Sequence, residues 1–300
     1  MPRNLLHTGF SVAAPGKATT PDIYKDRPRI STRSKKLQGG VFYPKSLEGR
    51  MEAIVVDYEK DPTLAAYIHG IEQYANTVLQ QMKSSGRDPT FDDLASIVAH
   101  KIPSDFPYSH RMLRHDYLDV TYPPGKKVHL GVIMQKQDMI CRHMALLFAA
   151  TIEHLRDKGN PQVKMRVNTD TDVRFMGDTQ HDLIEKDNTS GHGYVVIKRL
   201  DGGHTRYLVA DPTAGQVFDI RSAFKRREKS PAAYRYLFSV IRLVFQEEHS
   251  RDGAFKHWLT RARKSDPHIQ RLMVDAENAY VQSGDIDGIR HIRAYLAKAV

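Results

Sequence analysis

"SGHGYVVIKRLDGGHTRYLVADPTAG" (residues 190–215) predicts a β-hairpin that is apolar on both faces. Two runs rich in β-branched and aromatic residues, 193–199 and 205–211, flank an Asp-Gly pair, the strongest short-range signal for a tight hairpin turn. Because apolar side chains occupy consecutive positions from Tyr194 to Ile197, other elements must cover both faces of the hairpin. The stretch therefore predicts a sheet that is buried between two layers.

The ends of this hairpin carry a histidine and an acid. If Asp201 and Gly202 form a two-residue loop, His192 pairs with Asp211, and directly opposed side chains have Cβ atoms ~5 Å apart, close enough for an imidazole–carboxylate hydrogen bond. A three-residue loop would place His192 opposite Pro212 instead. Glycines on both sides of His192 leave the backbone free to approach another element. The alternative is a solvated histidine at a strand end.

Upstream, "MICRHMALLFAATIEHL" (139–155) holds the only cysteine of the chain and predicts a helix. One buried stripe is expected to contain Cys141, Ala145, Phe148, Ile152 and Leu155. Cys141 falls in the first turn, where backbone N–H groups and the positive end of the helix dipole stabilise a thiolate. His143 is expected to point away from this stripe, as a surface residue or one behind the site. The alternative for Cys141 is a small buried hydrophobe, but a histidine–acid pair is what a thiol nucleophile needs as its base.

The rest of the sequence divides by texture into three regions. Residues 1–50 are rich in Pro, Gly, Ser, Thr and Lys/Arg with little periodicity, and predict a disordered basic leader. Residues 51–220 form the predicted catalytic domain, and residues 221–300 a helical C-terminal extension. Within these regions we expect helices over 61–84, 88–102 and 232–249, two further helices joined by "SGDID", and extended segments over 115–122 and 126–134.

Composition restricts the class of protein. A single cysteine forms no internal disulfide, which is typical of a reducing compartment or of a protein delivered into another cell. Charge breaks every long apolar stretch, so no membrane span is expected, and the first residues lack the apolar block of a secretory signal. We therefore expect a cytoplasmic protein, or one secreted into a host or target cell by a route that needs no signal peptide.

The net charge of +10 is concentrated in two segments. Residues 1–50 hold ten Lys or Arg against three Asp or Glu, and residues 221–264 hold twelve against four. Basic segments of this kind can contact an anionic surface. Nucleic acid is not expected as a partner, because no stacking aromatics accompany a glycine-rich motif of the RNA-binding type.

Three motifs in this order, "MICRHMALLFAATIEHL", "SGHGYVVIKR" and "RYLVADPTAG", resemble the transglutaminase-like superfamily, which follows the papain-like cysteine-protease plan. That family has Cys at a helix start, His opening a strand, and Asp on the next strand ahead of Pro-Thr. The Cys-Arg-His-x-Ala-Leu-Leu run is similar to its plant kinase-associated and bacterial members. The resemblance covers about 115–215, and Tyr194 stands where many members have Trp.

The resemblance implies an α+β papain-like core in which the cysteine helix packs on an antiparallel sheet, with extra C-terminal helices. It implies Cys141 as nucleophile, His192 as base and Asp211 as the residue that orients the base. Gln135 has the spacing at which papain-like enzymes place their oxyanion glutamine, with Gln137 as the runner-up. Neither a cofactor nor a metal is implied.

The implied function is thiol-dependent acyl transfer through a thioester, on a protein or peptide that carries glutamine or another amide. Deamidation, transamidation and proteolysis remain alternatives within this class. The basic leader and helical tail suit a secreted bacterial effector or toxin. A different class of function is a non-catalytic interaction module that retains the fold.

Overall fold

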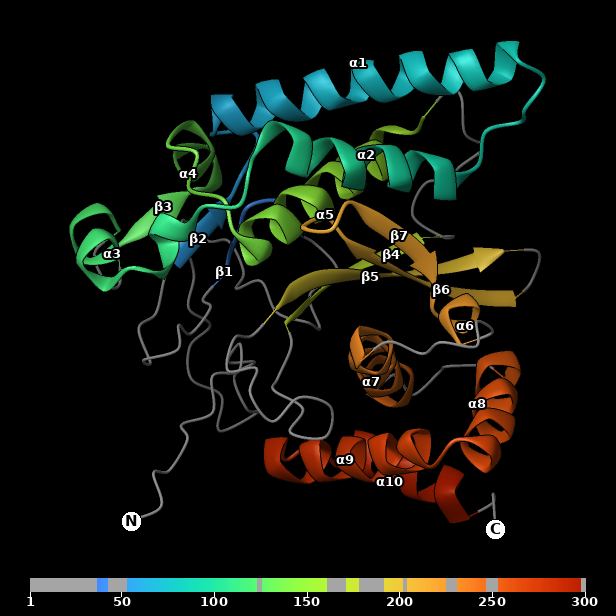
Figure 1. Cartoon of the computed structure of the whole chain (residues 1–300). Coiled ribbons are helices and arrows are strands. Elements are labelled where there is room, and N and C mark those ends of the chain that lie inside the picture. The colour runs from blue at the N-terminus through green and yellow to red at the C-terminus, as the bar shows by residue number, and fades with distance from the viewer. Residues whose placement is uncertain are drawn as a thin grey trace.

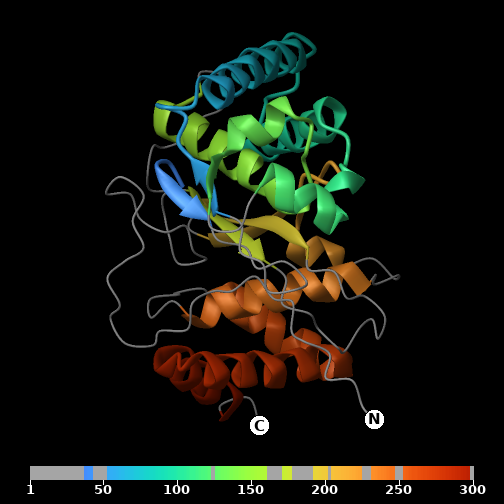
Figure 2. The same cartoon turned by 90° about the vertical axis from the view of Figure 1, so that its left-hand side faces the viewer.

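The structure is a computed structural model. It describes residues 37–42, 53–122, 126–160, 171–177, 192–201, 204–224, 231–246 and 253–297. The described elements stack as a layer of helices, a four-stranded sheet and a second layer of helices (Figure 1). The same stacking is visible after a quarter turn (Figure 2). The chain is therefore a mixed α+β protein, as the sequence predicts.

The first helical layer contains the cysteine helix and the two helices that were predicted upstream of it. These are α1 (Pro62–Ser84), α2 (Phe91–Asp105) and α5 (Cys141–Lys158). Asp61 caps α1 by accepting a hydrogen bond from the Leu64 N–H at 3.1 Å, as the Asp-Pro start suggests. On α5 the predicted stripe is buried: Cys141 is 6% exposed, and Ala145, Phe148, Ile152 and Leu155 are 0% exposed. The helix prediction for 139–155 is confirmed.

The central sheet is antiparallel throughout. Its strands, in spatial order, are β4 (Thr171–Gly177), β5 (Gly193–Asp201), β6 (His204–Asp211) and β7 (Gln216–Asp219). Val195 pairs with Ala210, whereas the predicted Asp-Gly loop would pair it with Leu208. The predicted register is therefore wrong by two residues, and residues 202 and 203 connect the strands. A Gly-Gly pair serves a two-residue turn as well as Asp-Gly does. A displacement of two also keeps every side chain on its predicted face.

The two faces of this sheet contribute to two different cores. Toward α2 and α5 the strands present the aliphatic side chains Val195, Ile197, Leu208 and Ala210. Toward the second helical layer they present Tyr194, Val196, Tyr207 and Val209. All eight side chains are at most 1% exposed, so both faces are covered, as the apolar pattern requires.

The second helical layer comprises α7 (Pro231–Gln246), α8 (Gly253–Ser265), α9 (Pro267–Ser283) and α10 (Ile286–Ala297), reached through the short α6 (Ile220–Ala223). The sequence predicts three helices after residue 231, and the structure has four, since α8 is a separate helix. Helices α7 and α8 contact the aromatic face of the sheet directly, and all four helices share a core with the hairpin.

A smaller sheet lies beside the first layer and changes the boundary of the predicted leader. It pairs β1 (Gly40–Phe42) with β2 (Ala53–Val56), and β2 in parallel with β3 (Lys127–His129). The backbone N–H groups of Leu37 and Gln38 donate to the Glu153 carboxylate on α5 at 2.7 and 2.9 Å. Residues 37–42 therefore belong to the folded body; the rest of the leader lies outside the described residues.

Two segments predicted as extended are largely helical. They form α3 (His115–Thr121) and, after the three residues of β3, α4 (Leu130–Gln135); the 3-10 turn η1 (His110–Leu113) precedes α3. In α4, Leu130, Ile133 and Met134 are buried while Val132 is 40% exposed, which is the spacing of a helix and not the alternation that an extended segment would show. The Asp61 carboxylate accepts the Gly131 N–H at 2.7 Å and thereby fixes the start of α4 on α1.

Candidate active site

Cys141 is the first residue of α5 and reaches the site from the first helical layer. Ile140 before it is extended, so the chain turns into the helix directly at the thiol. The backbone N–H groups of a first helical turn favour a negative charge. The position of Cys141 thus combines burial with an electrostatic environment that suits a thiolate.

His192 immediately precedes β5, whose first residue is Gly193. The backbone of Gly193 lies so close to α5 that a Cβ atom added there would lie 2.7 Å from the Arg142 Cα. Real Cβ contacts are not that short, so glycine is required at this position. The close approach delivers His192 to the first turn of α5, and it fits the expectation that glycine frees the backbone here.

Asp211 is the last residue of β6. Its Oδ2 atom lies 2.7 Å from the Nε2 atom of His192. In the observed register the two residues are diagonal neighbours, not the directly opposed pair that was predicted. Oδ1 accepts the backbone N–H groups of Thr213 at 3.0 Å and Ala214 at 3.3 Å. The carboxylate is therefore held from both sides, and the structure brings Cys141, His192 and Asp211 together.

The charges of the three groups support one another. Burial raises the pKa of the Cys141 thiol, but the hydrogen bond and charge of His192, the Gly193 N–H and Arg142 together bring this pKa below its ordinary value. Burial lowers the pKa of His192, yet hydrogen bonds to Asp211 and Cys141 and the charges of both raise it to about 10. A thiolate–imidazolium pair is the state that these shifts favour near neutral pH.

Asp211 stays ionised beside this pair. Burial raises its pKa, but the hydrogen bond and charge of His192, followed by hydrogen bonds from Tyr236 and the Ala214 N–H, bring it below its ordinary value. Since Nε2 of His192 meets Asp211, the second ring nitrogen, Nδ1, is the one that faces the thiol. The arrangement has the connectivity of a nucleophile, its base and the group that orients the base.

The loop before α5 is fixed by a buried acid. The Asp138 side chain is 0% exposed and accepts hydrogen bonds from the hydroxyls of Tyr122 at 2.9 Å, Ser109 at 3.2 Å and Tyr117. Arg111 forms an ion pair with it at 3.1 Å. Because Asp138 stands three residues before Cys141, this cluster fixes the backbone that leads to Cys141.

His143 is buried, which corrects the expectation of a surface position. It is 0% exposed, and its Nδ1 atom lies 3.1 Å from the Asp138 carbonyl oxygen and 3.3 Å from the Ile140 nitrogen. A residue in the first turn of a helix can fold back on the preceding backbone, whose polar groups have no helical partner there. His143 therefore supports the start of α5 from inside.

The predicted oxyanion residue is engaged elsewhere. Gln135 is exposed on α4, and its Nε2 atom donates to the Thr63 hydroxyl at 2.5 Å, at the start of α1. Gln137, the runner-up, is exposed in the turn that follows α4 and has a φ of 56°. The assignment of Gln135 stays a prediction, and the Thr63 contact does not support it.

Two tyrosines that interact with the triad of Cys141, His192 and Asp211 were not identified from the sequence. Tyr108 is 37% exposed, and its neighbour Ser109 donates its N–H to the Met139 carbonyl at 2.8 Å, two residues before Cys141. Burial and then the charge of Cys141 raise the pKa of the Tyr108 hydroxyl, which places this side chain within electrostatic range of the thiol. Tyr236, on α7, donates to Asp211 Oδ2 at 2.7 Å. Neither belongs to a motif, so no sequence signal pointed to them.

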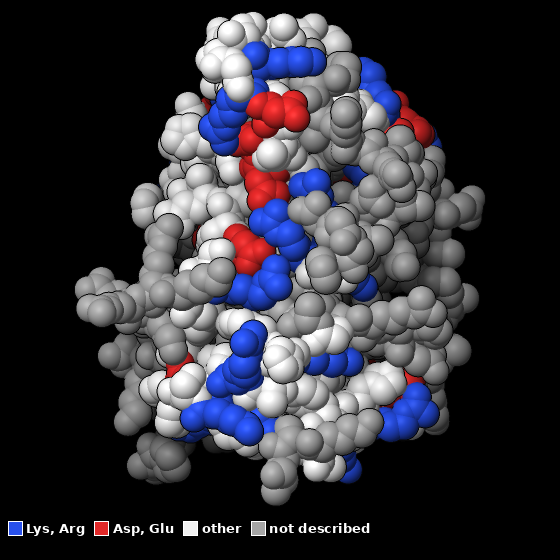
Figure 3. Space-filling model, turned by 90° about the vertical axis from the view of Figure 1, so that its right-hand side faces the viewer, with Lys and Arg blue, Asp and Glu red and all other residues white. Residues whose placement is uncertain are grey.

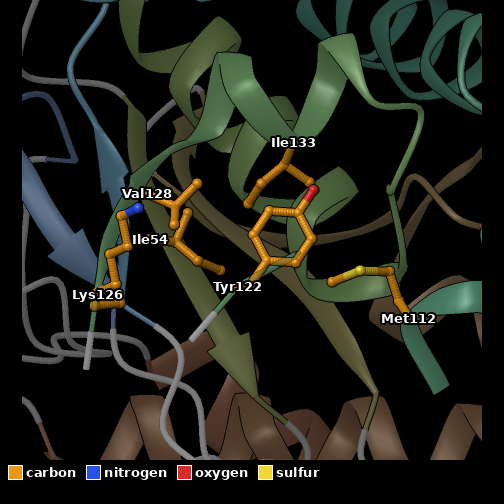
Figure 4. Close-up of a pocket in the computed structure, with 7 residues that line it drawn as sticks. Ile54, Met112, Tyr122, Lys126, Val128 and Ile133 are labelled. Carbon is orange, nitrogen blue, oxygen red and sulfur yellow. The ribbon is translucent and has the colours of Figure 1, made fainter. Parts of the chain in front are cut away.

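A pocket lies apart from the triad, between the small sheet, α4 and η1 (Figure 4). Its lining residues are Ala53, Ile54, Met112, Tyr122, Lys126, Val128 and Ile133. The lining is apolar except for the Lys126 amine and the Tyr122 hydroxyl, which binds Asp138. No triad residue lines it, so this pocket does not define the chemistry of the site.

Basic side chains gather on one face of the molecule. Figure 3 shows acidic and basic residues together in its upper half, whereas Lys and Arg predominate in the lower half. Helix α8, on this side of the molecule, contains Lys256, Arg261, Arg263 and Lys264 and no acidic residue. Contact with an anionic surface stays a prediction. Within the described ranges, no helix is long and apolar enough to span a membrane.

Comparison with known proteins found no match to the chain among family models, curated proteins or solved structures. The part of the chain that the structure describes also contains no group of three or more His, Cys, Asp or Glu side chains that could hold a metal ion. The function of the site is therefore inferred from its own geometry.

Proposed function

We propose that the chain is a thiol-dependent acyl-transfer enzyme with Cys141 as its nucleophile. The observation that carries the proposal is that His192 hydrogen-bonds both the Cys141 thiol and, at 2.7 Å, the Asp211 carboxylate. An unpaired buried histidine would favour the neutral ring, and an isolated buried thiol would stay protonated. Their pairing activates the sulfur and provides the proton that the leaving group needs.

In the proposed reaction the Cys141 thiolate attacks the carbonyl carbon of a carboxamide or peptide bond. The His192 imidazolium gives its proton to the leaving nitrogen, so ammonia or an amine departs and a thioester remains. Water or a second amine then attacks the thioester and gives its proton to the neutral imidazole. The C–S bond of the thioester breaks and releases the thiolate, so the products are a carboxylic acid or a new amide, and the thiolate–imidazolium pair is restored. Asp211 keeps the imidazole in orientation throughout and does not itself accept the proton.

The developing oxyanion needs hydrogen-bond donors. We assign this role first to the backbone N–H of Cys141, because it belongs to the first turn of α5. The order of motifs, with Cys before His before Asp, supports a papain-like plan of the transglutaminase-like type. A protein or peptide glutamine is the substrate that this plan favours, so we rank deamidation or transamidation ahead of peptide cleavage.

The test is the pH dependence of Cys141 alkylation by iodoacetamide. Wild-type protein should react rapidly near neutral pH. His192→Ala should react mainly in the alkaline range, because burial then raises the pKa of the thiol without the opposing hydrogen bond and charge of His192. His69→Ala is a matched control, since His69 lies on the exposed side of α1, is hydrogen-bonded to Gln73, and belongs to no part of the proposed site. Equal profiles for wild type and His192→Ala would contradict the catalytic assignment and leave a non-catalytic interaction module as the alternative.

A further inference from the structure

The Asp211 carboxylate has a partner from outside the predicted catalytic domain. Helix α7 follows the hairpin in the chain and packs against the aromatic face of the sheet, and α8–α10 contribute to the same core. From α7, the Tyr236 hydroxyl donates to Oδ2 of Asp211 at 2.7 Å. The same oxygen lies 2.7 Å from His192 Nε2, so one carboxylate oxygen joins the imidazole to the second helical layer.

The ring of Tyr236 is fixed as firmly as its hydroxyl. Tyr236 is 7% exposed, and its ring meets Tyr194 edge-on with centroids 4.8 Å apart. It also contacts Phe218 of β7 at 5.4 Å. The Tyr194 ring in turn lies 6.0 Å from the His192 ring, centroid to centroid, with an angle of 30° between the ring planes. Tyr236 thus contacts the acid directly and a neighbour of the base through its ring.

These contacts differ in kind from ordinary core packing. A hydrogen bond donated to an ionised carboxylate is stronger than one between neutral groups. With the two backbone N–H groups on Oδ1, the donors of Asp211 come from three directions, which fixes the plane of the carboxylate. A rigid carboxylate is what holds the imidazole in the tautomer and orientation that proton transfer requires.

Resting on the proposed function, we propose that Tyr236 is a positioning residue for the Cys141–His192–Asp211 site, which makes the C-terminal helical layer part of the catalytic unit. Tyr236 does not touch the reacting atoms; it acts through Asp211. The layer formed by α7–α10 therefore has a function in the reaction in addition to covering the sheet.

The test compares two tyrosine-to-phenylalanine variants on the same helix. Tyr236→Phe removes only the hydroxyl and keeps the ring contacts with Tyr194 and Phe218. Tyr234→Phe is the matched control, because the Tyr234 hydroxyl donates to Asp266 at 2.8 Å, a tyrosine–aspartate bond outside the triad. Both variants are measured for melting temperature and for the rate of iodoacetamide alkylation of Cys141 across pH.

We expect Tyr236→Phe to alkylate about fivefold more slowly near neutral pH, with its acid limb moved to higher pH. The direction follows because a carboxylate that has lost one of its donors is less rigidly placed, so it orients the imidazolium beside the thiolate less well. Tyr234→Phe should keep the wild-type profile. In an Asp211→Asn background, Tyr236→Phe should add nothing further, since the carboxylate through which Tyr236 acts on His192 is already absent.

The outcomes separate this inference from the proposed function. If His192→Ala abolishes the neutral reactivity but Tyr236→Phe has the profile of Tyr234→Phe, positioning by Tyr236 is overturned and the enzyme assignment stands. The same holds if the effects of Tyr236→Phe and Asp211→Asn are additive. If His192→Ala changes nothing, the proposed function itself fails, and the positioning role fails with it.

Discussion

The two faces of the central sheet are built from different chemistry. Toward α5 the face is aliphatic, and alanines on the helix allow a close approach of helix to strand. Toward α7 the face carries Tyr194 and Tyr207, which pack against further aromatic rings such as Tyr236 and Phe255. The aliphatic face thus supplies a tightly packed support for the thiol, and the aromatic face supplies hydroxyl groups within a buried core.

The triad lies where these two environments meet. By strand alternation His192 continues the row of Tyr194, and Asp211 continues the row of Val209, so both belong to the aromatic face. Cys141 comes from the helix on the other face. The proposed nucleophile and its proposed base therefore belong to opposite layers and meet at the end of the sheet. Substitutions that act on one layer alone can test this division.

Cys141→Ala should have the largest effect on activity and little effect on the fold. It removes the nucleophile, so alkylation and turnover should both be lost. The melting temperature should change by only a few degrees, because a small residue replaces a small one in a buried helix turn. Glutamine-containing peptides incubated with each protein and examined by mass spectrometry provide the measurement. Residual deamidation or cross-linking by the variant would identify a different nucleophile.

Residues 37 and 38 support α5, the helix on the aliphatic face of the sheet, through their hydrogen bonds to Glu153. A chain that begins at residue 37 keeps the two N–H donors to Glu153, whereas one that begins at residue 53 leaves this buried carboxylate without them. The shorter chain should lose at least about 3 kcal/mol in the free energy of unfolding relative to the longer one. Urea unfolding of both chains measures the difference.

Equal stability of these two chains would show that β1 and the Glu153 contacts contribute nothing. Glu153→Gln in the chain from residue 37 serves as a control. It alters the acceptor while β1 remains in place. It therefore separates the contribution of the Glu153 carboxylate to stability from the contribution of strand pairing.

Gly193→Ala tests the contact between layers at the site itself. Its Cβ would lie 2.7 Å from the Arg142 backbone, so strand and helix must separate. We expect a loss of about 1–3 kcal/mol in stability together with slower alkylation of Cys141. Gly70→Ala on α1 is the control, because a Cβ there meets nothing within 4 Å. That variant should be neutral or more stable by about 1 kcal/mol. Unchanged reactivity of Gly193→Ala would refute the close approach.

The smallest effect is on the pH dependence of stability. The folded-state pKa of Asp211 lies below its ordinary 3.8, so its contribution is present above that pH and is lost as the pH falls through the folded value. The pKa of His192 is raised from 6.5 to about 10, so its contribution is full below 6.5 and is lost as the pH rises through about 10.

Asp211→Asn should therefore lower the free energy of unfolding by about 1 kcal/mol near neutral pH relative to wild type. It should also make this free energy depend less on pH in the acid and the alkaline range. Urea unfolding as a function of pH gives this curve. An Asp211→Asn curve parallel to that of wild type would show that the ion pair does not contribute to folding.

Local signals predicted the elements that bear the site. The α5 stripe is confirmed because a period of 3.6 residues over four turns is a strong pattern, and the hairpin because two β-rich runs flank a glycine turn. Its register was wrong because "LDGGH" offers two equally good two-residue turns, Asp-Gly and Gly-Gly. The segment at 126–134 misled because a short apolar run fits a strand or a helix until its packing partners are known.

The sequence by itself determined the order and type of the chemical groups: a cysteine at a helix start, a histidine between glycines before a strand, and an aspartate at the end of the next strand. Only the tertiary structure decided which groups support them, since the hydrogen bonds that hold Asp138 before α5 and the bond from Tyr236 to Asp211 join distant segments. No local pattern encodes such contacts. They arise because burying both faces of the hairpin requires two helical layers, and the second layer brings a hydroxyl to Asp211.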